Sequence, residues 1–526
     1  RLRCDSEIIE LLNGQASTLI CCGHTHTPRT VSLSTGQIIV NPGSVGLQAY
    51  TDDEPIVHSM ENFNSMASYS VVEKTIDSWN INHIRVPYDV QQAVDAANGA
   101  RTAWASLTID ERVNWLDKIA NSLESHSEKI ASLESLDTGK PISLARAVDA
   151  ARSVTNFRFF AKFAKDYTDE KFEMEDAVNH VILKPVGIAG LITPWNLPLY
   201  LLSWKIAPAI VMGNTVVAKP SELTPLTANL LAEVIDEVGL PAGVVNIVHG
   251  SGPEAGQAIV EHPEISLISF TGGTETGRKV ATIAAPMFKK LSLELGGKNA
   301  SIVLDDADLE TTIPGVARAG FLNQGQVCLC GSRIFVSEKI WDEFVPRFVD
   351  YVKNMKVGDP SSDDSDLGAL VSSAHRDKVE SYIHLAQREG GKILCGGQIP
   401  KLDSPFDKGF FLEPTIVSGL DYLSRTATEE IFGPVVTIHP FGTDEEAIKM
   451  TNCTDYGLAG SVWTGDSERG TKVAEKIETG MVWVNTWLHR DLRVPFGGVK
   501  DSGVGREGGR WSLGFFSEAV NICVKS

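Results

Sequence analysis

Cysteine is scarce in this chain and shows no pairing pattern. Only eight cysteines occur among 526 residues, and they lack the regular spacing that is typical of a disulfide framework. Sparse cysteine in a long chain is typical of a reducing compartment, and no signal-peptide pattern is visible. We therefore expect a protein of the cytoplasm.

Long apolar runs and an excess of basic residues are also missing. The apolar runs, such as residues 206–212, are too short to cross a bilayer. Asp and Glu number 67 against 47 Lys and Arg, and the net charge of −20 disfavours nucleic acid and anionic membrane as partners. Hydrophobic and charged contents of 43% and 22% are ordinary for a globular protein. The length predicts about three domains.

The first 88 residues differ in pattern from the rest. Short apolar runs between turn residues predict strands at residues 18–22, 37–40, 69–72 and 81–86. Between the first two runs lies Gly-His-Thr-His, in which His24 and His26 have a spacing that suits a shared metal ion. Two ligands alone do not make a metal centre, and such pairs also occur by chance.

Three stretches of this region resemble the carboxy-terminal part of calcineurin-like metallophosphoesterases: CCGHTHTPRT, IIVNPGSVGLQAY and SYSVVEKTIDSWNINHIRVPYD. In that family the Gly-His-x-His pair supplies the last ligands of a two-metal centre. The other ligands come from Asp-x-His and Gly-Asn-His-Asp stretches, which this chain lacks. Without them two metals cannot be fixed for attack on a phosphate. The resemblance implies a remnant with no metal and no activity, although a phosphoesterase that works through His24 and His26 is a rival interpretation.

From Val90 the pattern becomes helical and then alternates. Apolar residues at three- and four-residue steps predict helices from Val90 to Leu133, ended by Gly139 and Pro141, and a further helix at 147–164. Strands are predicted at 187–193, 214–219, 244–249, 267–271 and 290–295, with helices near 199–211, 225–238, 253–261 and 275–284. Apolar strands that alternate with amphipathic helices indicate an α/β fold with a parallel sheet covered on both faces. Such sheets bind ligands beyond the carboxyl ends of their strands.

Three residue types with the means for acyl transfer stand in separate stretches. Cys328 lies in Asn-Gln-Gly-Gln-Val-Cys, where Gly325 lets the backbone bend and main-chain N–H groups can favour a thiolate. Glu294 in Leu-Glu-Leu-Gly-Gly-Lys offers a base, and Asn196 in Pro-Trp-Asn offers an amide donor. A lone cysteine, however, is commonly a small buried hydrophobe.

Loops after the predicted strands suit a nucleotide. Glycines in 249–256 and 271–277 permit close approach of a phosphate to a helix start, although ordinary strand–helix turns would look the same. Lys219 and Glu222 are placed to grip a ribose, with the carboxylate accepting from its hydroxyls.

Taken together, the motifs resemble those of NAD-dependent aldehyde dehydrogenases. TPWN, KPSE, FTGGTETG, LELGGK, NQGQVC, EEIFGP and PFGG occur in the family's order from about Val90 to Ser526. The resemblance implies a Rossmann-type cofactor domain, an α/β catalytic domain and small oligomerisation strands. It also implies Cys328 as the nucleophile, Glu294 as the general base, and the Asn196 amide with the Cys328 N–H as oxyanion donors. The cofactor residues that it implies are Ile192, Trp195, Lys219, Glu222, Gly256, Gly272, Gly273, Gly277, Glu430 and Phe432. A carboxylate at Glu222 would repel a 2′-phosphate, so NAD is favoured over NADP.

Within the family the resemblance is to the 2-aminomuconic and 2-hydroxymuconic semialdehyde dehydrogenase groups, through stretches such as ARSVTNFRFFA and VNTWLHRDLRVPFGG. Their substrates carry a carboxylate far from the aldehyde. Arg152 and Arg490 match the positions that bind it, because an arginine fork suits a planar carboxylate. Arg493 is an alternative to Arg490, and a solvated helix position is the alternative for Arg152. The aldehyde with a 2-amino group is preferred over that with a 2-hydroxy group.

The resemblance also divides the chain. It implies a metallophosphoesterase-like remnant at 1–88, an NAD-binding domain at 89–170 and 184–296, a catalytic domain at 297–505, and oligomerisation segments at 171–183 and 506–526 that would form a homodimer or homotetramer. The strands that normally open the family's fold are replaced here. An inactive fusion is therefore the other alternative.

Overall fold

The computed structural model describes residues 89–167 and 169–525 and, before them, residues 8, 12, 17, 19–21, 29–35, 37–41, 49–52, 58–61, 66–74 and 79–87. In this first part β1 (Leu19–Cys21), β3 (Ile38–Asn41) and β2 (Arg29–Ser32) form one sheet. Two hairpins follow, β4 (Ala49–Asp52) with β5 (His58–Glu61) and β6 (Met66–Lys74) with β7 (Trp79–Pro87). Strands lie at all four stretches where they were predicted. His24 and His26 lie outside the described residues.

Three helices follow where the helical pattern begins: α2 (Val90–Ser106), α3 (Ile109–Ser125) and α4 (Ser127–Thr138). Asp89 caps α2 by accepting from the Gln92 N–H, and Thr108 and Glu111 form a reciprocal capping box on α3. Gly139 ends α4 in a left-handed conformation with φ of 78°. The predicted termination at Gly139 is confirmed.

The next predicted helix begins with a π-helix. Residues Ala145–Ala150 form the π-helix η1, and α6 (Ala151–Lys165) continues from it without a break. Phe157 and Phe160 on α6 are fully buried, and α6 packs against α3 and α7 (Pro198–Val211). The spacing of apolar residues alone predicts a helix here but not the π-helical turn at its start.

The predicted parallel sheet is present and has six strands in the order β12-β11-β10-β13-β14-β24. Its members are β10 (Ile188–Ile192), β11 (Thr215–Lys219), β12 (Val245–Ile247), β13 (Ile265–Thr271), β14 (Lys290–Glu294) and the antiparallel edge strand β24 (Gly503–Val504). Helices α7, α8 (Leu226–Glu237), α9 (Gln257–Glu261) and α10 (Thr274–Ala284) connect them. The register pairs Ile192 with both Lys219 and Phe270, so the strands end side by side.

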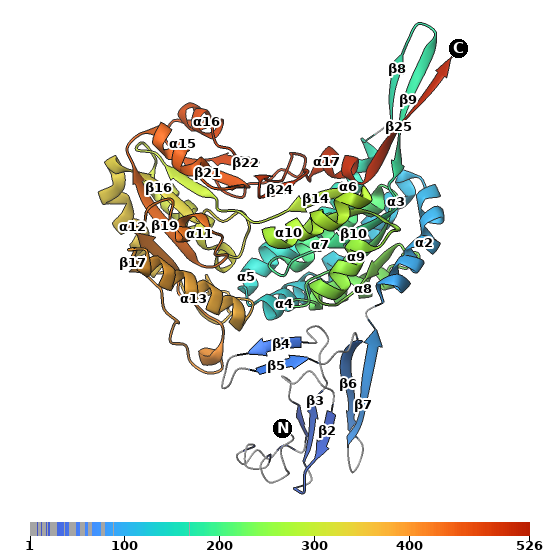
Figure 1. Cartoon of the computed structure of the whole chain (residues 1–526), viewed down its shortest axis with the longest axis horizontal. Coiled ribbons are helices and arrows are strands. Elements are labelled where there is room, and N and C mark those ends of the chain that lie inside the picture. The colour runs from blue at the N-terminus through green and yellow to red at the C-terminus, as the bar shows by residue number, and fades with distance from the viewer. Residues whose placement is uncertain are drawn as a thin grey trace.

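A second, seven-stranded sheet lies beside the first (Figure 1). Its order is β17 (Lys392–Cys395), β18 (Thr415–Ser418), β19 (Val435–Phe441), β16 (Arg333–Ser337), β15 (Ala300–Val303), β21 (Ala459–Trp463) and β22 (Met481–Val484). The accompanying helices are α11 (Leu309–Phe321), α12 (Trp341–Lys353), α13 (Ser373–Arg388), α15 (Asp444–Asn452) and α16 (Ser467–Ala474), whereas α17 (Gly509–Phe515) packs against α6 and α7 of the first sheet. Each sheet has its own apolar core.

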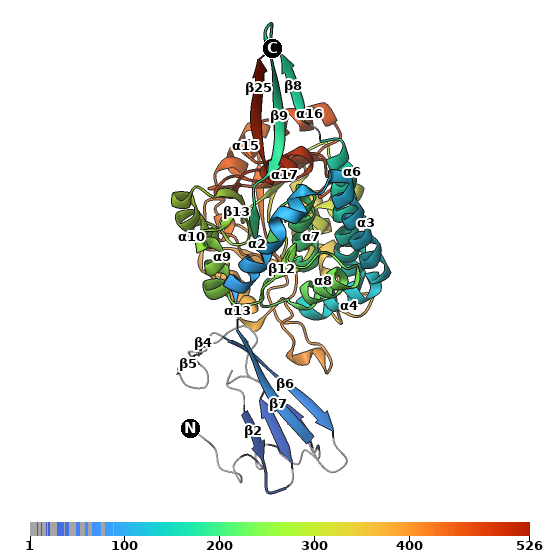
Figure 2. The same cartoon turned by 90° about the vertical axis from the view of Figure 1, so that its right-hand side faces the viewer.

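A three-stranded sheet projects from this body (Figures 1 and 2). It consists of β8 (Glu170–Glu173), β9 (Ala177–Pro185) and the final strand β25 (Ser517–Lys525), all antiparallel. Phe172, Met174, Ile522 and Val524 are exposed on it. This sheet contains the segments that the sequence predicted to assemble subunits, and that role stays a prediction. Among the described residues, no helix has the length and apolar character needed to cross a membrane.

Candidate active site

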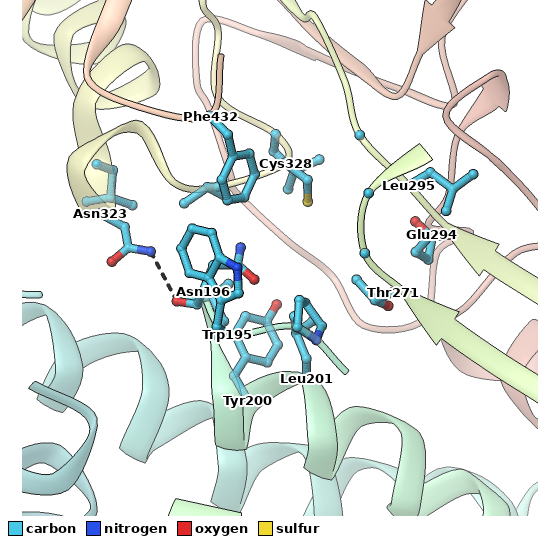
Figure 3. A pocket seen from close by; sticks show the side chains of 18 of the residues that line it. Trp195, Asn196, Tyr200, Leu201, Thr271, Glu294, Leu295, Asn323, Cys328 and Phe432 are labelled. Atoms are coloured by element: carbon cyan, nitrogen blue, oxygen red, sulfur yellow. Dashed lines mark hydrogen bonds between the residues drawn. The ribbon is translucent and has the colours of Figure 1, made fainter. Parts of the chain in front are cut away.

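A cavity of about 300 Å³ lies between loops of the two large sheets (Figure 3). One wall comes from residues 194–201, 271–273 and 294–296, which lie after β10 and at the ends of β13 and β14. The other comes from residues 322–329, 375–378, 430–432 and 488–496, which belong to loops and helices around the second sheet. Cys328, Asn196 and Glu294, which are distant in the sequence, all line this cavity.

Backbone geometry directs Cys328 into the cavity. After α11 ends at Phe321, Asn323, Gln324 and Gly325 take left-handed φ angles of 54°, 56° and 69°. A Cβ at Gly325 would lie 2.1 Å from the Gly433 oxygen, so only glycine fits this turn. Figure 3 shows the Cys328 sulfur pointing into the space between Asn196 and Glu294.

The pKa of the Cys328 thiol is shifted away from the thiolate that we expected. Burial raises the pKa of the Cys328 thiol, and the nearby carboxyl groups of Glu294 and Glu430 raise it further. Arg490 acts in the opposite direction but is the smaller influence. The error arose because the sequence around Cys328 suggests N–H donors, whereas its carboxylate neighbours come from other parts of the chain.

Asn196 is anchored to the segment that carries Cys328. Its side-chain Nδ2 donates to the main-chain oxygen of Gln326 at 2.9 Å. Its own main-chain oxygen accepts from Asn323 Nδ2 at 3.1 Å, the bond that is dashed in Figure 3. Asn196 is 4% exposed. The amide donor therefore has a fixed relation to the loop before Cys328.

Glu294 ends β14, opposite Thr271 of β13 and Gly503 of β24. Its Oε1 atom is buried and has no hydrogen-bond partner among the described residues. A Cβ at Gly497 would lie 2.6 Å from that oxygen, so the glycine of the PFGG motif makes room for the carboxyl group. Burial raises the pKa of Glu294 well above its usual value, and the neighbouring Glu507 raises it further. Such a shift makes a carboxylate a stronger base.

Glu507 belongs to a buried charged group behind Glu294. Lys205 Nζ lies 2.7 Å from Glu507 Oε1 and donates to Ser269 Oγ at 2.8 Å. Trp204 Nε1 donates to Glu507 Oε2, also at 2.7 Å. These bonds hold a carboxylate near Glu294 without making it solvent-exposed, which is one reason why the pKa of Glu294 is high.

The predicted cofactor residues fall into two groups. Trp195, Gly272, Gly273, Glu430 and Phe432 line the cavity itself. The remaining five lie outside its lining, at or near the strand ends of the first sheet: Ile192, Lys219, Glu222, Gly256 and Gly277. Lys219 Nζ pairs with Glu222 Oε2 at 2.9 Å, and a Cβ at Gly256 would lie 3.5 Å from the Lys219 side chain. Lys219, Glu222 and Gly256 therefore lie together.

The strand ends fit a dinucleotide. Gly273 precedes α10 without a side-chain cap, and a Cβ there would meet nothing within 4 Å. A helix start of this kind favours a phosphate. Thr271 Oγ1, at the end of β13, is buried without a partner in the described part of the chain. Gly272 and Gly277 differ, because a Cβ at either would clash with the ring of Phe270 or with Leu295. Internal packing therefore accounts for those two glycines.

An aromatic wall contains residues that the motifs did not predict. Phe432 has φ of 62°, and its oxygen lies 2.7 Å from His375 Nε2. The rings of Trp195 and His375 lie 5.0 Å apart. His375 and Lys378 line the cavity from α13, and burial lowers the pKa of His375 to about 4. No spacing signal marks them, since their contacts form only when α13 meets loops that are distant in the sequence.

Glu430 is tied to the loop after Glu294. Its Oε1 accepts from the Gly297 N–H at 2.9 Å, and a Cβ at Gly296 would lie 2.4 Å from Oε2. Lys298, fully buried next to this loop, donates to the Thr426 oxygen. Burial lowers the pKa of Lys298 to about 7.

The two predicted carboxylate-binding arginines are neighbours but not equivalent. Arg490 lines the cavity, donates to the Tyr200 hydroxyl at 2.9 Å and stacks on the Phe496 ring at 3.9 Å. Arg152 is not part of the lining and lies over the Tyr200 ring at 5.3 Å. It is half-buried rather than solvated, and burial lowers the pKa of its guanidinium. Arg493 pairs with Asp491 and is exposed outside the cavity.

Most of the chain is similar in sequence and in structure to known proteins of one family. A sequence model of the aldehyde dehydrogenase family matches residues 79–522, and thus begins within β7, before Val90. The chain is 49% identical over 441 residues to 2-aminomuconic semialdehyde dehydrogenase of Mus musculus, covering 83% of this chain and 91% of that protein. It is 45% identical over 444 residues to 2-hydroxymuconic semialdehyde dehydrogenase of Pseudomonas sp. (strain CF600), covering 83% and 91%. The NAD⁺ complex of an aldehyde dehydrogenase from Bacillus cereus superposes with a TM-score of 0.81 at 38% identity, covering 87% of this chain and 93% of that one.

Proposed function

The chain belongs to the aldehyde dehydrogenase family, and we propose that it oxidises an aldehyde to a carboxylate through a thioester on Cys328, with NAD as the oxidant. The observation that supports this proposal is the meeting of a thiol, an amide donor and a high-pKa carboxyl group in one cavity. Each of the three comes from a different loop, and each suits one step of acyl transfer.

The steps follow from the chemistry of these groups. The Cys328 thiol gives its proton to water, its sulfur then bonds to the aldehyde carbon, and the carbonyl oxygen takes the negative charge. Asn196 Nδ2 donates to that oxygen, and one such donor is worth about 10²–10³ in rate. The carbon then loses a hydride and becomes a thioester. Glu294 takes a proton from water, which attacks the thioester, breaks the C–S bond and releases the carboxylate.

NAD, when bound, supplies the acceptor for the hydride. Residues of this chain that would hold it are Lys219 and Glu222 at the ribose, the start of α10 at the phosphates, and Glu430 with Phe432 at the nicotinamide end. Support comes from the uncapped helix start at Gly273 and from the NAD⁺ complex of the Bacillus cereus relative. The negative charge of Glu222 disfavours a 2′-phosphate and hence NADP.

The substrate of this proposal is a muconic semialdehyde, preferably the 2-amino compound, with the 2-hydroxy compound as the alternative. Arg490 gives the cavity a guanidinium for the substrate's distant carboxylate. Tyr200 stands between Arg490 and Arg152, so Arg152 acts through Tyr200 and through the local charge. The names of the relatives support both substrates.

The function is tested with the purified protein, NAD and each semialdehyde, by the absorbance of NADH. We expect turnover that Cys328→Ala abolishes and that Cys330→Ala largely retains. Cys330 is the matched control because it is a buried thiol two residues away that faces the Leu322 oxygen. Equal rates for wild type and Cys328→Ala would overturn the proposed chemistry.

The rivals make different predictions. An inactive fusion would show no rise in thermal unfolding temperature with NAD, whereas an enzyme that binds NAD only when folded must be stabilised. A phosphoesterase would cleave a chromogenic phosphodiester in the presence of divalent metal.

We propose that the projecting sheet of β8, β9 and β25 forms a subunit contact, which sedimentation of the wild type against an Ile522→Lys variant would test.

A further inference from the structure

Lys140 is a buried cation that the proposed chemistry does not use. Its side chain is fully buried in the turn after α4. Nζ lies 2.9 Å from Asp149 Oδ2 in η1 and 3.7 Å from Glu134 Oε2 in α4. A lysine is almost never fully buried unless it is paired. Its third contact reaches the candidate site, because Nζ also donates to the main-chain oxygen of Asn196 at 3.1 Å.

The Asn196 oxygen is therefore held from two directions. Lys140 approaches from the helical layer, and Asn323 Nδ2 approaches from the turn before Cys328. Asn323 Nδ2 also donates to the Gln326 oxygen at 3.2 Å, the same oxygen that accepts from the Asn196 side chain. Asn196, Asn323 and Gln326 thus form a closed hydrogen-bond network, which Lys140 joins from outside. This network ties the Asn196 amide to the loop that carries Cys328.

The carboxyl groups around Lys140 are also tied to this loop. Glu134 Oε1 accepts from the Leu199 N–H at 2.9 Å, at the start of α7, and from Thr227 Oγ1 at 2.8 Å. Asp149 lies in η1, whose Val148 lines the cavity. The stretch from Asn196 to Leu199 is thereby bonded to this ion group at both ends.

We propose that Lys140 is a positioning residue that sets the place of the Asn196 amide. A charged donor on the main-chain oxygen is stronger than a neutral one, and two fixed carboxylates prevent Nζ from turning away. A misplacement of about 1 Å at a donor can cost about 10²-fold in rate. This inference rests on the proposed oxyanion role of Asn196.

The test is a double-mutant cycle of Lys140→Met and Asn196→Ala. We expect Lys140→Met to lower kcat by about 10- to 100-fold in the wild-type background, with little change in the KM for NAD. In the Asn196→Ala background the same change should cost less than about threefold, because the group that it positions is gone. Asn196→Ala keeps measurable turnover above Cys328→Ala, since one donor supplies only part of the rate.

A matched control separates positioning from stability. Lys289→Met removes another buried lysine that donates to two main-chain oxygens, those of Val260 and His262, away from the cavity. It should lower the unfolding temperature without lowering kcat. If Lys140→Met does not fold, Asp149→Asn keeps the volume and weakens the anchor of Lys140, and it should show the same dependence on Asn196.

Equal losses from Lys140→Met in both backgrounds would overturn the inference, because a purely structural lysine acts regardless of Asn196. Unchanged kcat in the wild-type background would also overturn it. Failure of the proposed function is distinguishable, since Cys328→Ala would then match the wild type before any cycle is measured.

Discussion

Replacing Arg490 by alanine should separate carboxylated aldehydes from simple ones. Arg490 is the arginine of the cavity lining, and Phe496 and Tyr200 already hold its guanidinium. A hydrogen bond to a charged group contributes about 1.5–3 kcal/mol. Because Arg490 is half-buried, we expect the loss for a muconic semialdehyde to be about 2–3 kcal/mol, or roughly 30- to 150-fold in kcat/KM.

The assay compares kcat/KM for a muconic semialdehyde with that for an unbranched aliphatic aldehyde of similar length. Arg490→Ala should change the aliphatic rate by less than about threefold, because that substrate has no carboxylate to lose. Arg493→Ala is the matched control, three residues away, exposed and paired with Asp491, and it should affect neither substrate. Equal losses on both aldehydes, or a larger loss from Arg493→Ala, would refute carboxylate recognition by Arg490.

Four further predictions concern the base, the cofactor and the core. Glu294→Gln should form NADH in a rapid burst of up to one equivalent per active site and then turn over slowly, because the thioester forms but is not hydrolysed; quenched-flow measurement checks this. Since the basic form of Glu294 exists above a pKa that burial and Glu507 raise, wild-type hydrolysis should increase with pH well above the range of an ordinary glutamate, and this increase should vanish in Glu294→Gln. Glu222→Gln should improve kcat/KM for NADP relative to NAD, measured as a ratio. Trp104→Ala should cost about 3–5 kcal/mol in chemical denaturation, because Trp104 is 2% exposed and donates to the Ile210 oxygen.

Much of the fold follows from periodicity. The parallel strands from 188 to 294 are mostly apolar, and α8 and α10 between them have one apolar face, so both element type and order could be predicted. The π-helix at 145–150 could not, because its residues have an ordinary helical pattern and the wider turn forms around the buried pair of Asp149 and Lys140. The order of the second sheet is likewise set by long-range pairing.

The sequence predicted those residues of the candidate site that lie within a recognisable local motif. Asn196, Glu294 and Cys328 each stand in such a motif, and they line one cavity. His375, Tyr200 and Lys140 do not lie in a recognisable motif. Their contacts around the cavity are made with residues tens to hundreds of positions away in the sequence. The prediction of a favoured thiolate at Cys328 was wrong for a similar reason, because the burial of the thiol and the carboxyl groups near it both arise only from tertiary structure.

The carboxy-terminal stretch links the cavity to the projecting sheet. Arg490 and Phe496 face the cavity, Gly503 pairs with Glu294, and a short helix then leads to β25, which pairs residue by residue with β9. A neighbouring molecule that grips β25 would thus pull on a chain segment whose other end forms the chamber wall. If β25 forms the subunit contact that we propose, assembly and the cavity are coupled through this segment, and diluting the protein below the dissociation constant of the oligomer is expected to lower the activity per chain.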